Sequence, residues 1–384
     1  MIYFDNASTS HPKPKELIEE INYYLRDIGV SPGRGSYQAS QYAMKYVNQL
    51  RDQLCKLFML NTPSHLAFTK NATHSLNLVI KGILKEGDHV LICSNSHNAV
   101  IRPLETLKRT KKINYDIFDV DSCGQIDASQ LKSKITRKTQ LIVCNHASNA
   151  FGVVTEIGNL VEISHQEQIP ILLDVTQTAG IIPLDANQLE IDFLAGTGHK
   201  TLQGPPGVGY LYVKHPEKIT TLIEGGSDGN ASSSPLHPQI MPCKLEAGTL
   251  DYLSIAGLKG SLDGIIKKTL FCNIREHGLR LTEYAWERLE KIPSVTLHAT
   301  TDLSKKVPII SLSVKRMLPS TIASVLDQKF KILTRAGLHC SPISHKRMGT
   351  FPSGTLRISF NYSNTFDEID FFVESLTSII KEIN

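Results

Sequence analysis

The chain has 384 residues, enough for two or three domains with substantial cores, which excludes a small fold held together by disulfides. Its 41 basic and 37 acidic residues leave a net charge of +4 with no long run of like charge, so we expect neither a nucleic-acid nor a membrane partner. The seven cysteines show neither paired nor C-x-x-C spacing, which favours reduced thiols and no bound metal. With no export signal and no long apolar run, we expect a cytoplasmic protein.

The first two thirds of the chain predict two amphipathic helices followed by alternating strands and helices. The helices cover 13–28 and 40–58, after a short strand at the start of the chain. From 88 to 213, β-rich runs that are apolar on both faces alternate with helical patterns, which indicates a mostly parallel sheet covered on both sides. The predicted strands are 89–93, 141–144, 169–173, 193–195 and 208–213.

The last third predicts a smaller α+β domain. A long helical region at 253–291 leads to a strand at 307–312, a helix at 321–328, a strand near 332 and a last helix at 365–383. We therefore predict an α/β fold with three parts. They are an N-terminal segment, 1–14, packed near the small domain, a large domain, 15–250, and a connecting helix with the small domain, 251–384. Exposed loops are expected at 225–238 and 341–354, which are rich in Gly, Ser, Pro and His.

Polar residues follow the predicted strands, where ligands of open parallel sheets bind. Asp174 alone fits a helix cap or a structural ion pair equally well, and Lys200 alone would usually be a solvated surface residue. Together they match what pyridoxal phosphate requires, an amine that forms a Schiff base and a carboxylate that protonates the pyridine nitrogen. Burial at a strand end would lower the pKa of the Lys200 amine and make it a better nucleophile.

Two further features fit the same cofactor, although each has an ordinary explanation. The segment 68–79 places small polar residues before a helical pattern, which suits a phosphate but also fits a plain capped helix. His97 could stack on a flat ring and Asn149 could bind its phenolic oxygen. Either side chain could equally well satisfy only loop backbone.

In their order along the chain, these motifs resemble the class V aminotransferase-type enzymes of pyridoxal phosphate fold type I. The C-terminal motifs 334–340 and 354–359 resemble the cysteine desulfurase and selenocysteine lyase branch. The resemblance spans nearly the whole chain. It is carried by Phe4-Asp5-Asn6-Ala7-Ser8-Thr9, Asn71-Ala72-Thr73, Asp174 to Gln177, Thr197-Gly198-His199-Lys200, Gly204 to Gly209, Glu246-Ala247-Gly248-Thr249, Thr334 to Cys340 and Gly354 to Ser359.

The resemblance implies a role for each matching residue. Lys200 would bind pyridoxal 5′-phosphate covalently, Asp174 would contact the pyridine nitrogen, and His97 would stack on the ring. Arg357 would bind the substrate carboxylate as a bidentate fork, with Arg335 also near the substrate. Gln177 and Asn149 would lie near the ring oxygen and the substrate. The phosphate would be held by Ala72, Thr73, Thr197 and His199, with Thr249 reaching it from the second subunit of a homodimer.

Cys340 is the cysteine that the sequence marks as reactive. It lies in a polar loop beside His339 and five positions after Arg335, a cationic setting that favours thiolate. The resemblance implies that L-cysteine is converted to L-alanine, that Cys340 takes the sulfur as a persulfide, and that His97 is a candidate proton donor. A thiol or a sulfur-acceptor protein would then remove the sulfur.

Two alternative functions stay open. Asn71, His74 and Leu338 depart from the usual pattern of the family, so the same scaffold could act as a selenocysteine lyase, a cysteine-sulfinate lyase or an aminotransferase. The chain could also be a catalytically idle dimeric partner in a sulfur-transfer assembly, although the presence of Asp174 and Lys200 argues against this. The visible spectrum with and without L-cysteine would separate these functions.

Overall fold

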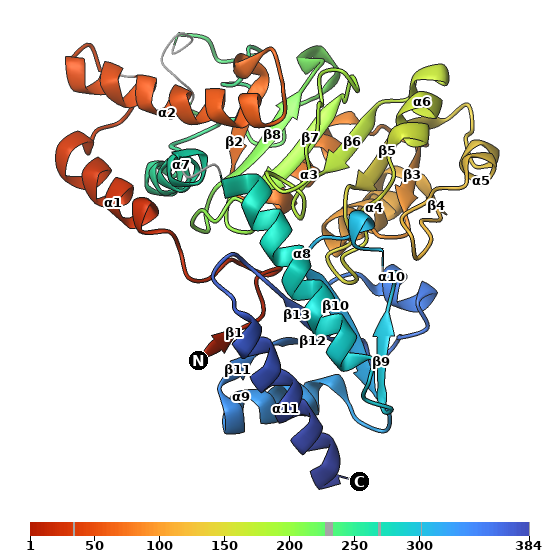
Figure 1. Ribbon diagram of the computed structural model, residues 1–384. Coiled ribbons are helices and arrows are strands. Elements are labelled where there is room, and N and C mark those ends of the chain that lie inside the picture. The colour runs from red at the N-terminus through yellow and green to blue at the C-terminus, as the bar shows by residue number, and fades with distance from the viewer. Residues whose placement is uncertain (34, 227–232, 268–269, 301, 384) are drawn as a thin grey trace.

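A computed structural model describes residues 1–33, 35–226, 233–267, 270–300 and 302–383, and Figure 1 shows a larger upper part and a smaller lower part. Within these residues the upper part holds a seven-stranded sheet with the strand order β2-β8-β7-β6-β5-β3-β4. Strand β8 runs antiparallel to both of its neighbours, and the other pairs are parallel. The strands are β2 (Leu66–Thr69), β3 (His89–Cys93), β4 (Asn114–Phe118), β5 (Thr139–Asn145), β6 (Ile171–Asp174), β7 (Phe193–Thr197) and β8 (Gly209–Val213).

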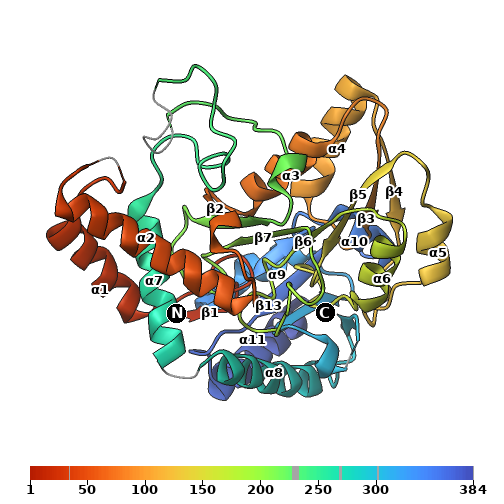
Figure 2. The same ribbon diagram turned by 90° about the horizontal axis from the view of Figure 1, so that it is seen from above.

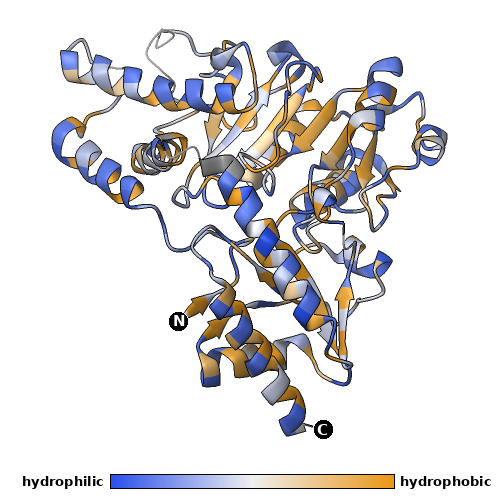
Figure 3. Cartoon of the chain, viewed as in Figure 1, coloured by the Kyte–Doolittle hydropathy of each residue, from blue (hydrophilic) through white to orange (hydrophobic). Residues whose placement is uncertain are grey.

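Helices cover both faces of this sheet because alternate residues of each buried strand point to opposite sides. Leu91, Ile142 and Leu173 pack toward α2 (Gln38–Leu57), α5 (Ala128–Ser133), α6 (Gly158–Gln166) and α7 (Tyr252–Lys267). Their strand neighbours pack toward α3 (Ala72–Ile83) and α4 (Asn98–Lys111). Figure 2 shows the two helix layers on either side of the sheet, and Figure 3 shows the apolar strands between them. The predicted doubly covered, mostly parallel sheet is confirmed.

The smaller part is built on an antiparallel sheet with the order β12-β13-β10-β9. Its strands are β9 (Val295–His298), β10 (Ile309–Val314), β12 (Arg335–Gly337) and β13 (Thr355–Ser359), and its helices are α8 (Leu270–Leu289), α9 (Pro319–Phe330), α10 (Pro342–Arg347) and α11 (Phe366–Ile383). The N-terminal strand β1 (Ile2–Tyr3) pairs with β11 (Ile332–Leu333), so the start of the chain joins this part. The packing core contains Phe4, Ile310, Ile358 and Phe372.

The structure departs from the predicted elements at a few places. The segment 341–354 is not only a loop, because α10 occupies its first half. The helix expected at 13–28 divides into α1 (Lys15–Tyr23) and a π-helical turn (Tyr24–Ile28). Within the loop expected at 225–238, residues 227–232 lie outside the described part of the chain. In that described part, none of the helices combines the length and the apolar character that a membrane span needs.

The predicted three-part division of the chain stays a prediction. Helix α1 packs against α7, which also contacts α2 beside the large sheet. Helix α8 instead packs against α11, β9 and β10. In Figure 1, α8 descends from the larger part along the smaller one.

Candidate active site

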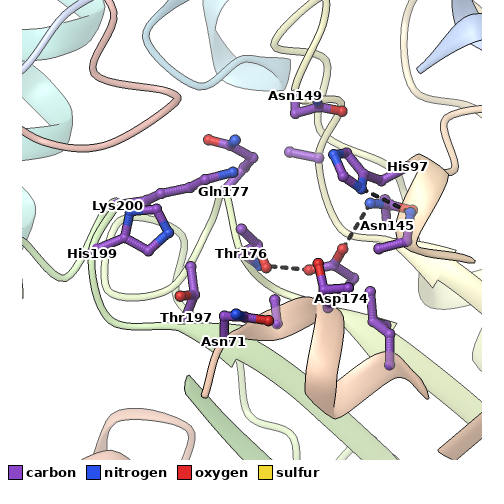
Figure 4. A pocket seen from close by; sticks show the side chains of 15 residues that line it. Asn71, His97, Asn145, Asn149, Asp174, Thr176, Gln177, Thr197, His199 and Lys200 are labelled. Atoms are coloured by element: carbon purple, nitrogen blue, oxygen red, sulfur yellow. Dashed lines mark hydrogen bonds between the residues drawn. The ribbon is translucent and has the colours of Figure 1, made fainter. Parts of the chain in front are cut away.

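A cavity of about 260 Å³ opens where the carboxyl ends of β5, β6 and β7 meet the N-termini of α3 and α4. We call it the inner cavity, and Figure 4 shows the side chains around it. Its position is the one expected for a ligand of an open parallel sheet. The lining residues include eleven that are polar or charged: Asn71, Thr73, His97, Asn145, Asn149, Asp174, Thr176, Gln177, Thr197, His199 and Lys200.

Asp174 ends β6 as a buried carboxylate without a charged hydrogen-bond partner. Its Oδ1 accepts from the Thr176 backbone N–H at 3.0 Å, and its Oδ2 accepts from the Asn145 amide at 3.0 Å. Burial raises the pKa of this carboxyl, although the hydrogen bonds and Lys200 oppose the shift. A cationic N–H placed beside it in the inner cavity would therefore be stabilised.

Lys200 follows β7 and lines the same cavity, and in Figure 4 it lies on the side opposite Asp174. Burial is the main reason why the pKa of its amine falls to about 8, and the charge of Arg357 adds to the shift. Asp174 acts in the other direction but does not outweigh burial. The expected lowering of the Lys200 pKa is thus present, and it raises the fraction of the amine that is uncharged and nucleophilic near neutral pH.

His97 is held at the N-terminus of α4, where its Nδ1 accepts from the Ala99 backbone N–H at 3.0 Å. Burial lowers the pKa of the ring to about 4, and the charges of Lys200 and Arg335 add to the shift. The ring is therefore uncharged at neutral pH and carries its proton on Nε2, which can donate a hydrogen bond. In this state His97 fits a stacking role better than that of a strong acid.

The first turn of α3 forms one end of the inner cavity. Ala72 and Thr73 line it, and the first backbone N–H groups of a helix have no partner inside that helix. His199 also lines this cavity, and its buried Nδ1 has no hydrogen-bond partner among the described residues. Gly209 of β8 lies so close that a Cβ there would be 2.6 Å from the backbone of Asn71. The arrangement suits an anion held by backbone N–H groups and a ring nitrogen.

Gln177 and Asn149 line the same cavity, but their amides already have partners. The Gln177 Nε2 donates to the Ala7 carbonyl at 3.0 Å, which ties the N-terminal segment to the cavity. The Asn149 Nδ2 donates to the His339 carbonyl at 2.6 Å, and its Oδ1 accepts from the Ser341 hydroxyl at 2.7 Å. Asn149 therefore bonds to the two residues that flank Cys340, to the backbone of His339 and to the side chain of Ser341.

Cys340 lies in that held loop, outside the wall of the inner cavity. Cys340 lines an adjoining hollow of about 290 Å³, which shares Thr73, His97 and Ala99 with the inner cavity. The Arg335 Nη2 lies 3.9 Å from the Cys340 Sγ. The structure thus brings a thiol, a guanidinium and the amine-bearing cavity together from distant parts of the sequence.

Besides Cys340 and Arg335, two more predicted residues do not line the inner cavity. Arg357 on β13 is almost fully buried and donates to Asp5 Oδ1 at 2.7 Å and to the Asn149 carbonyl at 2.7 Å. Its Nε is buried without a partner. Thr249 is exposed on the surface of this single chain. A contact of Thr249 with the inner cavity of a second subunit stays a prediction.

Several residues of the site were not singled out from the sequence. Asn145 pairs in register with Asp174 on the neighbouring strand, so its position after a predicted strand was the available signal. Asp5 and Ser8 hold the two arginines, with Ser8 accepting from Arg335 at 2.6 Å. Both lie in the N-terminal segment that we expected near the small domain, but no local pattern shows that they contact the two arginines.

The comparisons with known proteins agree with this geometry. Residues 2–372 match the model of the class-V aminotransferase family, and the chain belongs to that family. Within it, a probable cysteine desulfurase of Pyrococcus abyssi is 30% identical over 100% of this chain and 95% of the relative. A probable cysteine desulfurase of Methanothermobacter thermautotrophicus is 28% identical over 98% of this chain and 94% of the relative.

A solved structure has the same overall arrangement. The apo cysteine desulfurase of Thermococcus onnurineus superposes with a TM-score of 0.91 at 28% identity, covering 99% of this chain and 95% of that one. The predicted pyridoxal phosphate fold type I and its family are therefore confirmed. Enzymes of this family use pyridoxal 5′-phosphate.

Proposed function

We propose that this chain is a pyridoxal 5′-phosphate-dependent cysteine desulfurase, which converts L-cysteine to L-alanine and keeps the sulfur on Cys340. The observation that carries the proposal is the position of the Cys340 thiol, in a hollow that shares His97 with the cavity of Lys200 and Asp174. The names of the relatives support the same activity. The free thiols of Cys55, Cys93, Cys123, Cys144 and Cys340 suit a reducing compartment such as the cytoplasm.

The residues of the inner cavity fit pyridoxal 5′-phosphate. Asp174 is a buried carboxylate that lacks a cationic hydrogen-bond partner, and a protonated pyridine nitrogen would supply one. The orphaned His199 Nδ1 and the start of α3 suit the phosphate, together with Thr197. Lys200 would attach the aldehyde and His97 would cover the ring. When bound, the cofactor withdraws electrons from the α-carbon of an amino acid.

The chain supplies the acid–base groups and the positioning. Lys200, with a pKa lowered to about 8, can take a proton from the substrate α-carbon as an uncharged amine. We place the substrate carboxylate near Arg335 and Arg357, with Asn149 beside it. The Nη2 of Arg357 donates to both Asp5 and Ser8, so a fork with a carboxylate that uses Nη2 requires the release of one of these two bonds.

The sulfur transfer balances with no added oxidant or reductant. The Cys340 thiolate forms an S–S bond to the substrate sulfur while the bond from that sulfur to the β-carbon breaks. The electron pair of the broken bond goes to the carbon, which ends as the methyl group of alanine after protonation. Arg335, 3.9 Å from Sγ, stabilises the attacking thiolate. The proposed enzyme is a homodimer in which Thr249 completes the phosphate site of the other subunit, and a sulfur acceptor regenerates Cys340.

The test compares three variants of the purified holoenzyme. With L-cysteine, the wild type and the Cys123→Ala control are expected to form alanine and one persulfide per chain, mapped to Cys340 by mass spectrometry. Cys340→Ala should form no protein persulfide, and Lys200→Ala should carry no borohydride-fixed cofactor. A persulfide that survives in Cys340→Ala would refute the proposed role of this cysteine. Alanine from selenocysteine or cysteine sulfinate, without alanine from cysteine, would assign one of the other lyase activities.

A further inference from the structure

The hollow that Cys340 lines, which we call the outer hollow, is walled by one stripe from each of two helices. Thr73, Asn77 and Lys81 follow one another at four-residue spacing on α3. Asn98, Arg102 and Thr106 do the same on α4. Residues four apart lie on one face of a helix, so each helix turns a polar stripe toward the hollow.

Cys340 lies at one end of these stripes. Its carbonyl accepts from the Asn98 backbone N–H at 2.8 Å, which fixes it against the first residue of α4. Along α4, Arg102 lies one helical turn, about 6 Å, beyond Asn98. Along α3, Lys81 lies about 12 Å beyond Thr73. The outer hollow therefore runs from the sulfur toward two cations.

The charge of the outer hollow is of one sign. Among the described residues, no Asp or Glu lines it, and neither Lys81 nor Arg102 forms an ion pair. Arg335 adds a third positive charge behind the sulfur. A hollow of about 290 Å³ suits a small molecule. The complementary ligand is a small molecule with negative charge about one or two helical turns from its reactive end.

We propose that the outer hollow binds a small carboxylate-bearing thiol, which accepts the sulfur from Cys340. This inference rests on the proposed function, because it requires a persulfide on Cys340. The acceptor thiolate attacks the outer sulfur, forming a new S–S bond and breaking the bond to the Cys340 Sγ. The electron pair of that bond returns to Cys340 as thiolate, and the transferred sulfur keeps its proton. The cations also favour the thiolate form of the acceptor.

The test uses holoenzyme loaded with one equivalent of L-cysteine and measures persulfide loss by mass spectrometry. Glutathione is compared with its diethyl ester, which lacks both carboxylates, and with cysteamine, at equal thiolate concentrations. We expect glutathione to discharge the persulfide with the lowest half-saturating concentration. The difference in half-saturating concentration between glutathione and the other two thiols should decrease as the salt concentration rises, since exposed charges are screened.

Three variants locate the effect. Lys81→Gln and Arg102→Gln should each raise the half-saturating concentration of glutathione about two- to fivefold, the range of an exposed ion pair, with no change for the ester. Arg109→Gln is the matched control, because Arg109 lies on α4 two turns beyond Arg102 and outside the hollow. The proposal would be overturned if Arg109→Gln raised the half-saturating concentration of glutathione as much as the other two variants do. It would also be overturned if all the thiols discharged the persulfide equally well. A persulfide that only an acidic protein can discharge would overturn it as well.

A second measurement keeps the proposal testable if no persulfide forms. Cys340 is alkylated with anionic iodoacetate and with neutral iodoacetamide, and the two rates are compared in the wild type and in the variants. The outer hollow predicts that the ratio of iodoacetate to iodoacetamide reactivity falls about two- to fivefold in Lys81→Gln or Arg102→Gln. An unchanged ratio would refute the anion site. Failure of persulfide formation with a changed ratio would refute the proposed desulfurase activity and, with it, sulfur transfer to a small thiol, but would support the anion site.

Discussion

Asn149 shows how one amide can fix the geometry of a reactive cysteine. His339 and Cys340 both have left-handed backbone angles, with φ of 48° and 58°, and such a conformation costs a non-glycine residue about 1–2 kcal/mol. The Asn149 side chain bonds to the backbone of His339 and to the hydroxyl of Ser341. The paired left-handed residues are thus held by contacts from a loop of the larger part.

We expect Asn149→Ala to slow sulfur transfer onto Cys340 by about 10²-fold, because a reacting group displaced by about 1 Å loses that much. The variant should keep its cofactor, since Lys200 and the start of α3 are unchanged. Ser341→Ala removes only one of the two hydrogen bonds and should slow sulfur transfer by a smaller factor. Stopped-flow measurement of persulfide formation, with cofactor absorbance as the control, tests this prediction. A variant that transfers sulfur at the normal rate would show that Asn149 does not position the loop.

At the scale of elements, the sequence predicts those helices and strands that show a clear local hydrophobic pattern. The buried strands are continuous apolar runs, and β3 is found at its predicted bounds. Strand β4 was missed because it lies at the sheet edge, where its residues alternate between exposed and partly buried. Helix α10 was missed because its Pro and Ser residues are typical of loops. Asp174 and Lys200 could be placed because strand ends meet at one edge.

What the sequence could not predict are the contacts between distant segments. The ion pair of Arg357 with Asp5 joins residues 352 positions apart, and the bond from Asn149 to His339 spans 190 positions. No periodicity encodes such pairs, because they depend on the tertiary packing of segments that are distant along the chain. The same limit explains why the bonds from Asn149 to the Cys340 loop were not predicted, whereas its expected place near a cofactor oxygen stays a prediction.

The close approach of β8 to α3 gives a prediction at this scale. A Cβ on Gly209 would lie 2.6 Å from the Asn71 backbone, so Gly209→Ala should push the first turn of α3 away from the phosphate site. We expect a loss of about 1–3 kcal/mol in the free energy of unfolding and weaker retention of pyridoxal phosphate on dialysis. Gly158→Ala in α6 meets no atom within 4 Å and should be neutral or slightly stabilising. Thermal unfolding and cofactor absorbance measure both variants, and an equal response of the two would contradict the prediction.

At the scale of the whole molecule, the larger and smaller parts are joined by a backbone seam around Lys306. The Val307 backbone N–H donates to the Gly152 carbonyl at 2.8 Å, and Val153 forms a β-bridge with Lys306. Lys306 is fully buried at this seam, with its Nζ 4.8 Å from the Trp286 ring centre and 3.4 Å from the Phe151 carbonyl. Burial without a carboxylate lowers the pKa of its amine to about 7.

The contribution of Lys306 to the free energy of unfolding should therefore increase as pH rises. Between about pH 7 and 10.5, an unfolded lysine binds a proton that folded Lys306 does not, so the free energy of unfolding increases by up to about 1.4 kcal/mol per pH unit. Lys306→Met removes this contribution, whereas Lys13 and Lys200 titrate in both proteins and cancel in the difference. We measure urea unfolding of the cofactor-free proteins at pH 7, 8, 9 and 10. The free energy of unfolding of the wild type should increase relative to that of Lys306→Met at each step. Lys315→Met, at an exposed position, should follow the wild type. If the difference between the wild type and Lys306→Met stays constant with pH, then Lys306 is charged in the folded protein and the seam does not depend on its neutral form.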